Sequence, residues 1–292
     1  MRSRCQRRRF LRLLFLSFLL PFPVATLAAE APAAIRLGIL SIAPPARIHR
    51  NWQPFADHLG RVLHQPVVLV VPRGFGKLAR AVEAGEVDFF YVNSYVFYRL
   101  KQAGGAQGVA QMENLDGKVT SRSEIFVRRD SGIGSPADLK GRAIAFVSPL
   151  GAGGYLAPRA YLARNGLATG QDVQPVFTRN LANSIHQVLL GDVEAGTMCG
   201  VNFRLMQRKL DTGELRIIGH TEAYPENLIA ARADLDLARV ARFREAVLNM
   251  AQTAAGRQVL ARMRGMKIRR FVPYDPAIEA ITRRLLRESG LE

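Results

Sequence analysis

The sequence predicts an α/β protein with two lobes, each built on a mostly parallel sheet flanked by helices. Short apolar strands alternate with amphipathic helices along most of the chain, which is the pattern of sheets covered by helices on both faces. This alternation occurs in two series, separated near residue 120. The 292 residues, of which 48% are hydrophobic and 22% charged, are sufficient for two lobes of ordinary size, each with its own core.

The first series lies before residue 105. The alternating strand IRLGIL (35–40) is followed by the helix WQPFADHLGRVL (52–63), whose apolar residues recur at helical spacing, and by the buried-type strand PVVLVV (66–71). A helix, a strand and a helix are then expected over 75–87, 88–93 and 94–104. Strand–helix–strand units of this kind predict parallel pairing.

The second series begins at residue 123. Strands are expected over 123–129, 143–147, 173–178 and 194–199, and helices over 135–141, 154–166 and 183–191. This series supplies a second sheet with its own covering helices.

The chain then returns to the first lobe. Residues 215–232 predict a strand, an irregular crossing and another strand, and helices follow over about 236–264 and 276–288. Helices with no sheet of their own must pack on a lobe already formed, and the first lobe is the natural host. We therefore expect lobe one to contain residues 30–121 and 223–292, lobe two to contain residues 122–222, and the chain to make two hinge crossings.

The N-terminal segment is expected to be a leader. Its first twelve residues hold six arginines and no acidic residue, an apolar run follows, and small residues surround Ala28 and Ala29. This pattern predicts a secretory signal peptide over residues 1–29 and a mature protein in the periplasm. The run from Arg7 to Arg12 also resembles a twin-arginine signal, so the general secretory route and the twin-arginine route both stay open.

Charge and cysteine content narrow the function classes. Removing the six arginines of the leader lowers the formal charge from +17 to +11, and the remaining positive charges are scattered, which disfavours nucleic acid and favours small anions or an anionic membrane surface. Cys199 is the single cysteine left, so no intrachain disulfide can form, and no motif ties a histidine to it. The five histidines show no metal-binding spacing. We expect a monomer without cofactor, metal or catalytic residues.

A glycine-rich loop, SPLGAGGYLAP, joins the strand 143–147 to the next helix. Glycine lets backbone N–H groups come close to a ligand, and the unpaired N–H groups of a helix start attract anions. The loop therefore predicts the ligand-binding residues Ser148, Gly151, Ala152, Gly153 and Gly154. The alternative is a tight strand-to-helix turn that binds nothing.

A second group of candidates follows the carboxyl end of the strand 88–93, where open α/β sheets bind their ligands. Tyr91, Asn93, Ser94 and Tyr95 are predicted to contact the ligand from lobe one, although Tyr91 is equally suited to the core. Arg47 and Arg50, after the first strand, either add positive charge to the cleft or are simply solvated.

Four motifs carry a family resemblance when taken together. IGSPADLKGRAIAF, SPLGAGGYLAPRAYLARNG, VLLGDVEAG and FVPYDPAI occur in this order, and the likeness covers about residues 35–280. The chain thus resembles the periplasmic substrate-binding proteins of phosphonate, phosphite and phosphate-type ABC transporters. The resemblance implies a type II periplasmic-binding-protein fold, a phosphonate-, phosphite- or phosphate-like oxyanion held between the lobes, and an inner-membrane ABC permease as partner. Similar modules are sensory domains of membrane histidine kinases, so a sensing role with a kinase partner stays open.

This chain also departs from the family pattern. The relatives usually place Ser-Thr-Ser before the last glycine of the loop, where this chain has Gly151-Ala152-Gly153. The segment Asn180-Leu181-Ala182 lacks the histidine that the resemblance leads us to expect, and the acidic residues that hold a phosphonate amine have no clear counterparts. A plain anion, a carboxylate or a sulfur oxyanion therefore remains as good a candidate ligand as a phosphonate.

Overall fold

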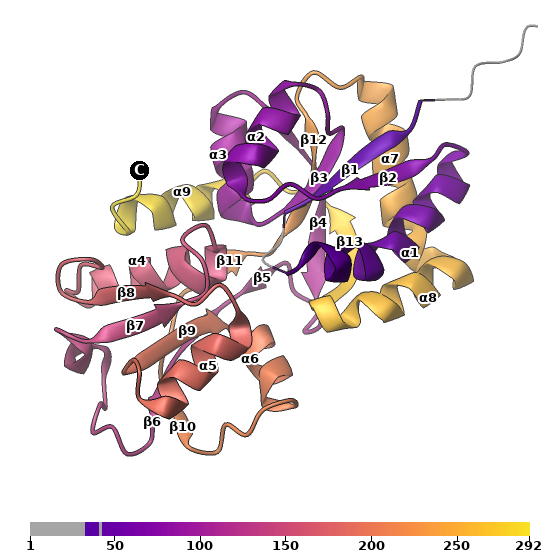
Figure 1. The fold of residues 1–292 in the computed structure, drawn as a ribbon. Helices are drawn as coiled ribbons and strands as arrows, with labels where there is room; N and C mark the ends of the chain where they lie inside the picture. Colours follow the sequence, from indigo (N-terminus) through magenta and orange to yellow (C-terminus); the bar gives the residue numbers. More distant parts are fainter. Residues whose placement is uncertain (1–32, 41–42) are drawn as a thin grey trace, which may run out of the picture. The chain divides into compact units, whose positions relative to one another are not determined.

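Two separate sheets organise residues 33–40 and 43–292, which are the part of the chain described by this computed structural model (Figure 1). The predicted signal peptide lies outside these residues. Within the described part, no helix is both long enough and apolar enough to cross a membrane.

The six-stranded sheet has the order β13-β4-β12-β3-β1-β2. Its strands are β1 (Ile35–Ile39), β2 (Val67–Val70), β3 (Phe89–Val92), β4 (Ala106–Asn114), β12 (Leu228–Arg232) and β13 (Ile268–Pro273). β1 pairs in parallel with β2 and β3. β12 is antiparallel to both β3 and β4, and β13 is antiparallel to β4.

Helices cover both faces of this sheet. One face carries α1 (Pro45–Leu63), α7 (Leu237–Leu248) and α8 (Ala254–Met263), and the other carries α2 (Phe75–Glu83) and α3 (Ser94–Gln102) (Figure 1). Alternate residues of β3 enter the two cores, because Phe89 packs with Trp52 and Phe243 on the first face, whereas Phe90 packs with Phe97 on the second.

The five-stranded sheet has the order β10-β6-β9-β7-β8. Its strands are β6 (Ser123–Arg128), β7 (Ala143–Phe146), β8 (Gln174–Phe177), β9 (Ala195–Cys199) and β10 (Leu215–His220). β7 is parallel to β8 and β9, whereas β6 is antiparallel to β9 and β10. The longer helices of this part are α4 (Ala157–Arg164), α5 (Leu181–Leu190) and α6 (Gly200–Gln207).

The chain passes between the two sheets through a short two-stranded ladder. β5 (Thr120–Ser121) leads away from the six-stranded sheet and β11 (Tyr224–Pro225) leads back to it, with Tyr224 opposite Ser121. The last helix, α9 (Ile278–Glu288), contacts α3 on one side and α4 on the other. An apolar cluster that includes Tyr95, Leu156 and Leu285 fills this contact.

The two-sheet α/β architecture is as predicted, but the expectation of mostly parallel sheets is wrong, since both sheets are mixed. The strands β4 and β13 were not predicted, and both pair antiparallel. β12 arrives from the other sheet and enters between β3 and β4, so its direction is set by a long connection. Local periodicity does not reveal this direction, because buried strands have similar sequences in either orientation.

Candidate functional site

The glycine-rich loop begins a helix whose first amides have no partner. A π-helical turn (Ala152–Leu156) continues directly into α4, so one helix runs from Ala152 to Arg164. Gly151 is its N-cap and offers no side-chain acceptor. Among the described residues, none of the amides from Ala152 to Tyr155 donates a hydrogen bond to a group outside this helix, and the first amides of a helix have no acceptor inside it. The loop therefore presents four free donors at the positive end of a helix.

The carbonyl groups of the loop are held by the five-stranded sheet. The Ser123 hydroxyl donates to the Gly153 carbonyl at 2.5 Å, and the Val147 amide donates to the Gly154 carbonyl at 3.3 Å. The Thr197 hydroxyl also donates to the Gly154 carbonyl, at 3.4 Å. Because these bonds fix the loop, its free amides are already oriented before any ligand arrives.

Two of the glycines are explained by close packing. A Cβ atom on Gly153 would lie 2.0 Å from the Tyr224 hydroxyl oxygen, and a Cβ atom on Gly154 would lie 3.1 Å from Cβ of Val147. Neither glycine has a positive φ. Glycine is needed here for space, and at Gly153 the space is taken by Tyr224.

Asn93 and Ser94 connect β3 to the loop and to the returning crossing. The Asn93 side-chain oxygen caps α3 by accepting from the Val96 amide at 3.0 Å, while its Nδ2 donates to the Leu150 carbonyl at 2.9 Å. The buried Ser94 hydroxyl donates to the Pro225 carbonyl at 3.1 Å. The structure thus brings Asn93 to the loop, and it pairs Ser94 with the crossing.

The two predicted tyrosines of lobe one are largely enclosed. Tyr91 packs on Trp52 with ring centroids 4.6 Å apart, and its hydroxyl donates to the Met112 sulfur at 3.1 Å. Burial raises the pKa of Tyr91 far above its usual value. Tyr95 and Ala152 belong to the apolar cluster between α3, the loop and α9. Ser148 accepts from the Leu150 amide at 3.3 Å and so shapes the turn.

A buried ionic cluster near the crossings was missed by the sequence analysis. Glu226 is 1% exposed, and its carboxylate accepts from Lys267 Nζ at 2.5 Å, from Asn114 Nδ2 at 3.0 Å and from the Ser121 hydroxyl. Lys267 Nζ lies 3.5 Å from the Cys199 sulfur. Burial by itself would lower the pKa of Lys267, but Cys199 and Glu226 outweigh burial and raise it.

The remaining candidates are the two arginines that follow β1. Arg47 and Arg50 are exposed on the first turns of α1. The histidines, cysteine and acidic residues in the described ranges form no group of three or more that could hold a metal ion.

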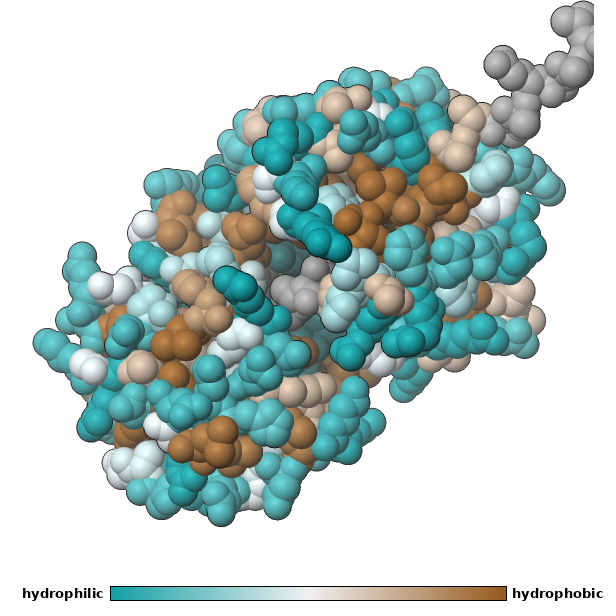
Figure 2. All heavy atoms as spheres, viewed as in Figure 1, coloured by the Kyte–Doolittle hydropathy of each residue, from teal (hydrophilic) through white to brown (hydrophobic). Residues whose placement is uncertain are grey.

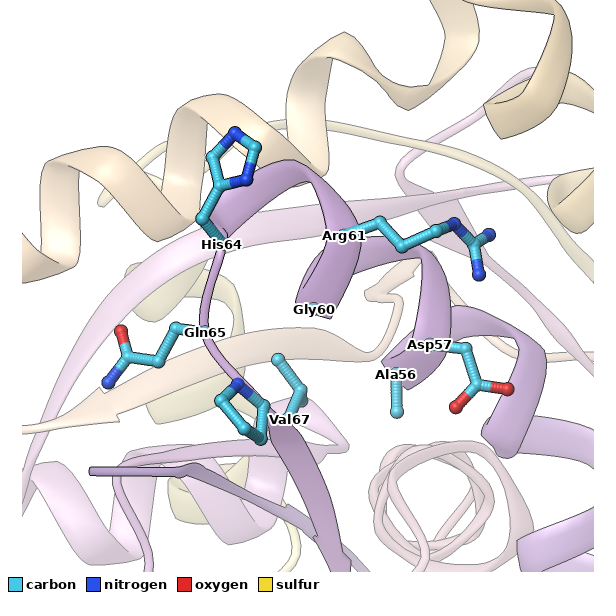
Figure 3. A pocket seen from close by; sticks show the side chains of 8 residues that line it. Ala56, Asp57, Gly60, Arg61, His64, Gln65 and Val67 are labelled. Carbon is cyan, nitrogen blue, oxygen red and sulfur yellow. The ribbon is translucent and has the colours of Figure 1, made fainter. Parts of the chain in front are cut away.

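Two surface hollows accompany these features. One, of about 600 Å³, lies between the end of α1 and the start of β2, where the side chains of Asp57, Arg61 and His64 point in different directions (Figure 3). The other, of about 330 Å³, lies beside the first crossing, and the contact of 2.5 Å between His220 Nδ1 and Glu124 Oε2 forms part of its wall. Burial raises the pKa of Glu124.

Hydrophilic side chains dominate the face of the molecule seen in Figure 2, and apolar side chains form separate patches on it.

Comparison with protein families gives a match over most of the chain. The family described as "ABC transporter, phosphonate, periplasmic substrate-binding protein" matches residues 37–277. Among curated proteins, the tetrathionate sensor histidine kinase TtrS of Salmonella typhimurium is 31% identical over 146 residues, which are 49% of this chain and 25% of that protein. The match therefore spans about a quarter of the length of that relative.

Solved structures share the fold. XAC2383 from Xanthomonas citri, bound to ATP, superposes with a TM-score of 0.78 at 21% identity, covering 88% of this chain and 97% of that chain. PhnD1 from Prochlorococcus marinus, in complex with methylphosphonate, superposes with a TM-score of 0.75 at 15% identity, covering 89% of this chain and 100% of that chain.

Proposed function

Because the chain belongs to the family of periplasmic substrate-binding proteins of phosphonate ABC transporters, we propose that it captures a small oxyanion at the amides of Ala152 to Tyr155 and presents it to an inner-membrane ABC permease. The family consists of substrate-binding proteins for transport, so binding and release are sufficient for this role. The leader over residues 1–29 would export the chain, and the exported protein would act as a monomer.

The four free amides of the loop are the observation that carries this proposal. A hydrogen bond to a charged acceptor contributes about 1.5–3 kcal/mol, and a helix dipole adds about 0.3–2 kcal/mol. A micromolar dissociation constant needs only about 8 kcal/mol. Four oriented amides and the enclosure of the ligand are therefore enough for useful affinity without any side-chain cation.

Closure about the two crossings would enclose the ligand. In this proposal lobe one, residues 30–121 and 223–292, and lobe two, residues 122–222, bend about the β5–β11 ladder. The bond from Asn93 to the Leu150 carbonyl supports such closure, because it joins α3 directly to the glycine-rich loop. The remaining predicted contacts, Tyr91, Ser94, Tyr95 and Ser148, would shape the surroundings of the ligand more than they would hold it.

The ligand class is a small oxyanion of phosphorus or sulfur. Phosphonate, phosphite and phosphate fit the family, and PhnD1 was solved with methylphosphonate. The loss of the Ser-Thr-Ser hydroxyls and the likeness to a tetrathionate sensor favour including sulfur oxyanions in the same test.

A second candidate function is sensing. The likeness to TtrS suggests that closure could be reported to a membrane histidine kinase rather than to a permease. Deletion of the gene separates the two roles. Loss of anion uptake supports transport, whereas unchanged uptake with loss of an anion-dependent transcriptional response supports sensing.

The test of the proposal is a thermal-shift screen followed by calorimetry. Phosphate, phosphite, methylphosphonate, sulfite, thiosulfate and tetrathionate are each added to the purified protein, and a ligand present at 100 times its dissociation constant stabilises the folded state by about 2.7 kcal/mol. We expect at least one of these anions to raise the melting temperature. The absence of any shift with all six contradicts the proposal.

The variant Gly151→Asp tests the location of the site. An aspartate at this N-cap accepts hydrogen bonds from the free amides and repels a second anion, so binding should be lost while the folded state keeps its stability or gains some. Gly76→Asp is the matched control, because it places the same charge in the exposed first turn of α2. Unchanged affinity of Gly151→Asp shows that the ligand binds elsewhere.

A further inference from the structure

The hydroxyl of Tyr224 is buried beside the side chains of Cys199 and Ser123, both of which influence its pKa, yet it forms no hydrogen bond of normal geometry with either. Tyr224 is 2% exposed, and its hydroxyl oxygen is buried with no hydrogen-bond partner among the described residues. Burial raises the pKa of Tyr224 well above its ordinary value, so the phenol keeps its proton. An unpaired buried hydroxyl is unfavourable in a folded protein, and native structures hold few of them. This one therefore needs an explanation.

The hydroxyl lies against Gly153 of the glycine-rich loop. It stands 2.0 Å from the position that a Cβ atom of Gly153 would occupy, so the loop could not carry a side chain there. The nearby Ser123 hydroxyl is engaged with the Gly153 carbonyl. The phenol, without a hydrogen bond of normal geometry, thus adjoins Gly153, whose amide is one of the free donors of the loop.

We infer that Tyr224 is a ligand-binding residue, which donates its hydroxyl to the same oxyanion that the amides of Ala152 to Tyr155 bind. This inference rests on the proposed function. The residues Gly151-Ala152-Gly153 supply no hydroxyl of their own, and the phenol of Tyr224, from another segment, lies against Gly153. Gly153 is then required for a functional reason, because only glycine leaves room for the hydroxyl beside the amides.

The position of Tyr224 gives this contact a further consequence. Tyr224 belongs to β11, opposite Ser121 in the ladder that joins the two sheets. A ligand bonded to this hydroxyl is therefore attached to the crossing itself as well as to the start of the helix. Binding would then order the segment about which the lobes move.

The experiment compares the wild-type protein with Tyr224→Phe, which keeps the ring and removes only the hydroxyl. Calorimetric titrations use methylphosphonate, phosphate and thiosulfate as probes. For each anion that the wild type binds, we expect Tyr224→Phe to raise the dissociation constant at least tenfold. The melting temperature without ligand should stay the same or rise, because an unpaired buried donor has been removed.

Two further variants make the outcome decisive. Tyr274→Phe is the control, since its hydroxyl already has an acceptor in Glu279, and its affinity should match the wild type. Gly151→Asp reports on the amides alone. Wild-type affinity in Tyr224→Phe, together with lost binding in Gly151→Asp, overturns this inference and leaves the proposed function intact. Failure of the wild type to bind any of the three probes overturns the inference too, and the six-anion screen then decides the fate of the proposed function separately.

A lowered melting temperature in Tyr224→Phe with unchanged affinity would also overturn the inference, because it would indicate a purely structural hydroxyl. Tyrosine difference absorption provides a second measurement. A phenol that gains a charged acceptor shifts its absorption, so ligand should produce a difference spectrum in the wild type and in Tyr274→Phe. The absence of this spectrum in the wild type contradicts the inference.

Discussion

The side-chain amide of Asn93 donates a hydrogen bond of 2.9 Å to the main-chain carbonyl of Leu150, and so connects the start of α3 to the glycine-rich loop. The oxygen of the same side chain caps α3 through the Val96 amide. One residue thus combines a helix cap with a contact between segments that belong to different sheets. A substitution that keeps the cap and removes the donor separates these two roles.

Asn93→Asp makes this separation. Aspartate caps a helix as well as asparagine does, but it places an oxygen opposite the Leu150 carbonyl, where the two repel each other. We expect ligand affinity to fall by about 1–3 kcal/mol while the melting temperature changes little. Calorimetry with the best anion of the screen measures the effect. Thr253→Asp, which places the same charge at the exposed cap of α8, is the matched control and should bind as the wild type does.

Gly153→Ala tests the space taken by Tyr224. The new methyl group would overlap the hydroxyl oxygen and the ring carbon that carries it, at 2.0 and 2.4 Å, and the buried ring cannot easily move. Overpacking of this kind lowers the free energy of unfolding by about 1–3 kcal/mol.

Chemical denaturation measures that loss, and a second substitution locates its cause. Tyr224→Leu in the Gly153→Ala background should recover part of the lost stability. Gly76→Ala is the control and should cause no loss of stability, because the nearest atom to its added Cβ is 3.7 Å away. Equal stability of Gly153→Ala and the wild type would mean that Tyr224 leaves the loop in solution.

The buried pair Lys267–Glu226 predicts strong non-additivity. Lys267→Met leaves the Glu226 carboxylate buried without a counter-charge, which lowers the free energy of unfolding by about 3–5 kcal/mol. Adding Glu226→Gln removes the unpaired charge, so the double variant should be more stable than Lys267→Met alone. Urea unfolding measures both. An exposed pair offers the control, since Lys140→Met, 3.9 Å from Asp172, should change stability little. If the losses of unfolding free energy in the two single variants simply added up in the double variant, the two side chains would not interact as an ion pair.

Glu113 predicts part of the pH dependence of stability. It lies opposite Arg270 across the β4–β13 pair, and the hydrogen bonds from Arg270 lower the pKa of Glu113 against the opposing effect of burial. A carboxyl group with a lowered pKa stabilises the folded state above its ordinary pKa, and this contribution disappears as the pH falls through the lowered value.

Glu113→Gln should therefore lower the free energy of unfolding by about 1 kcal/mol at pH 7, because Arg270 is partly exposed and solvent screens the pair. The difference from the wild type should shrink below the ordinary carboxyl pKa of 4.5 and vanish in stronger acid. Unfolding curves at several pH values measure it, with the exposed Glu83→Gln as control. A stability difference that grows on acidification would contradict a lowered pKa of Glu113.

Local pattern was enough to predict the strands and helices around the site, but it did not predict the partners across the fold. The glycine-rich loop between a strand and a helix follows from a short sequence motif. By contrast, Tyr224, Glu226 and Lys267 meet Gly153, Asn114 and Cys199 only because the crossings and β13 bring distant segments together. The polar segment AYPENL in the predicted crossing was the available signal for Tyr224 and Glu226. Lys267 had no comparable signal.

The alternation of side chains along a strand also predicted only part of the site. Neighbouring residues of a strand face opposite sides, and Tyr91 and Phe90 of β3 do belong to separate core clusters. Alternation did not indicate which side chain at the end of β3 would be accessible to a ligand, because that depends on the helices that pack against the sheet. Trp52 of α1 covers Tyr91, and this contact is fixed by tertiary packing rather than by the strand.

The insertion of β12 between β3 and β4 imposes an order on the growth of a nascent chain. Residues 123–220 supply every strand of the five-stranded sheet, so this half can assemble as soon as they have left the ribosome. At that moment β3 and β4 still lack the strand that will separate and join them, and their open edges are exposed to other chains. The half of the protein made first is thus the half completed last.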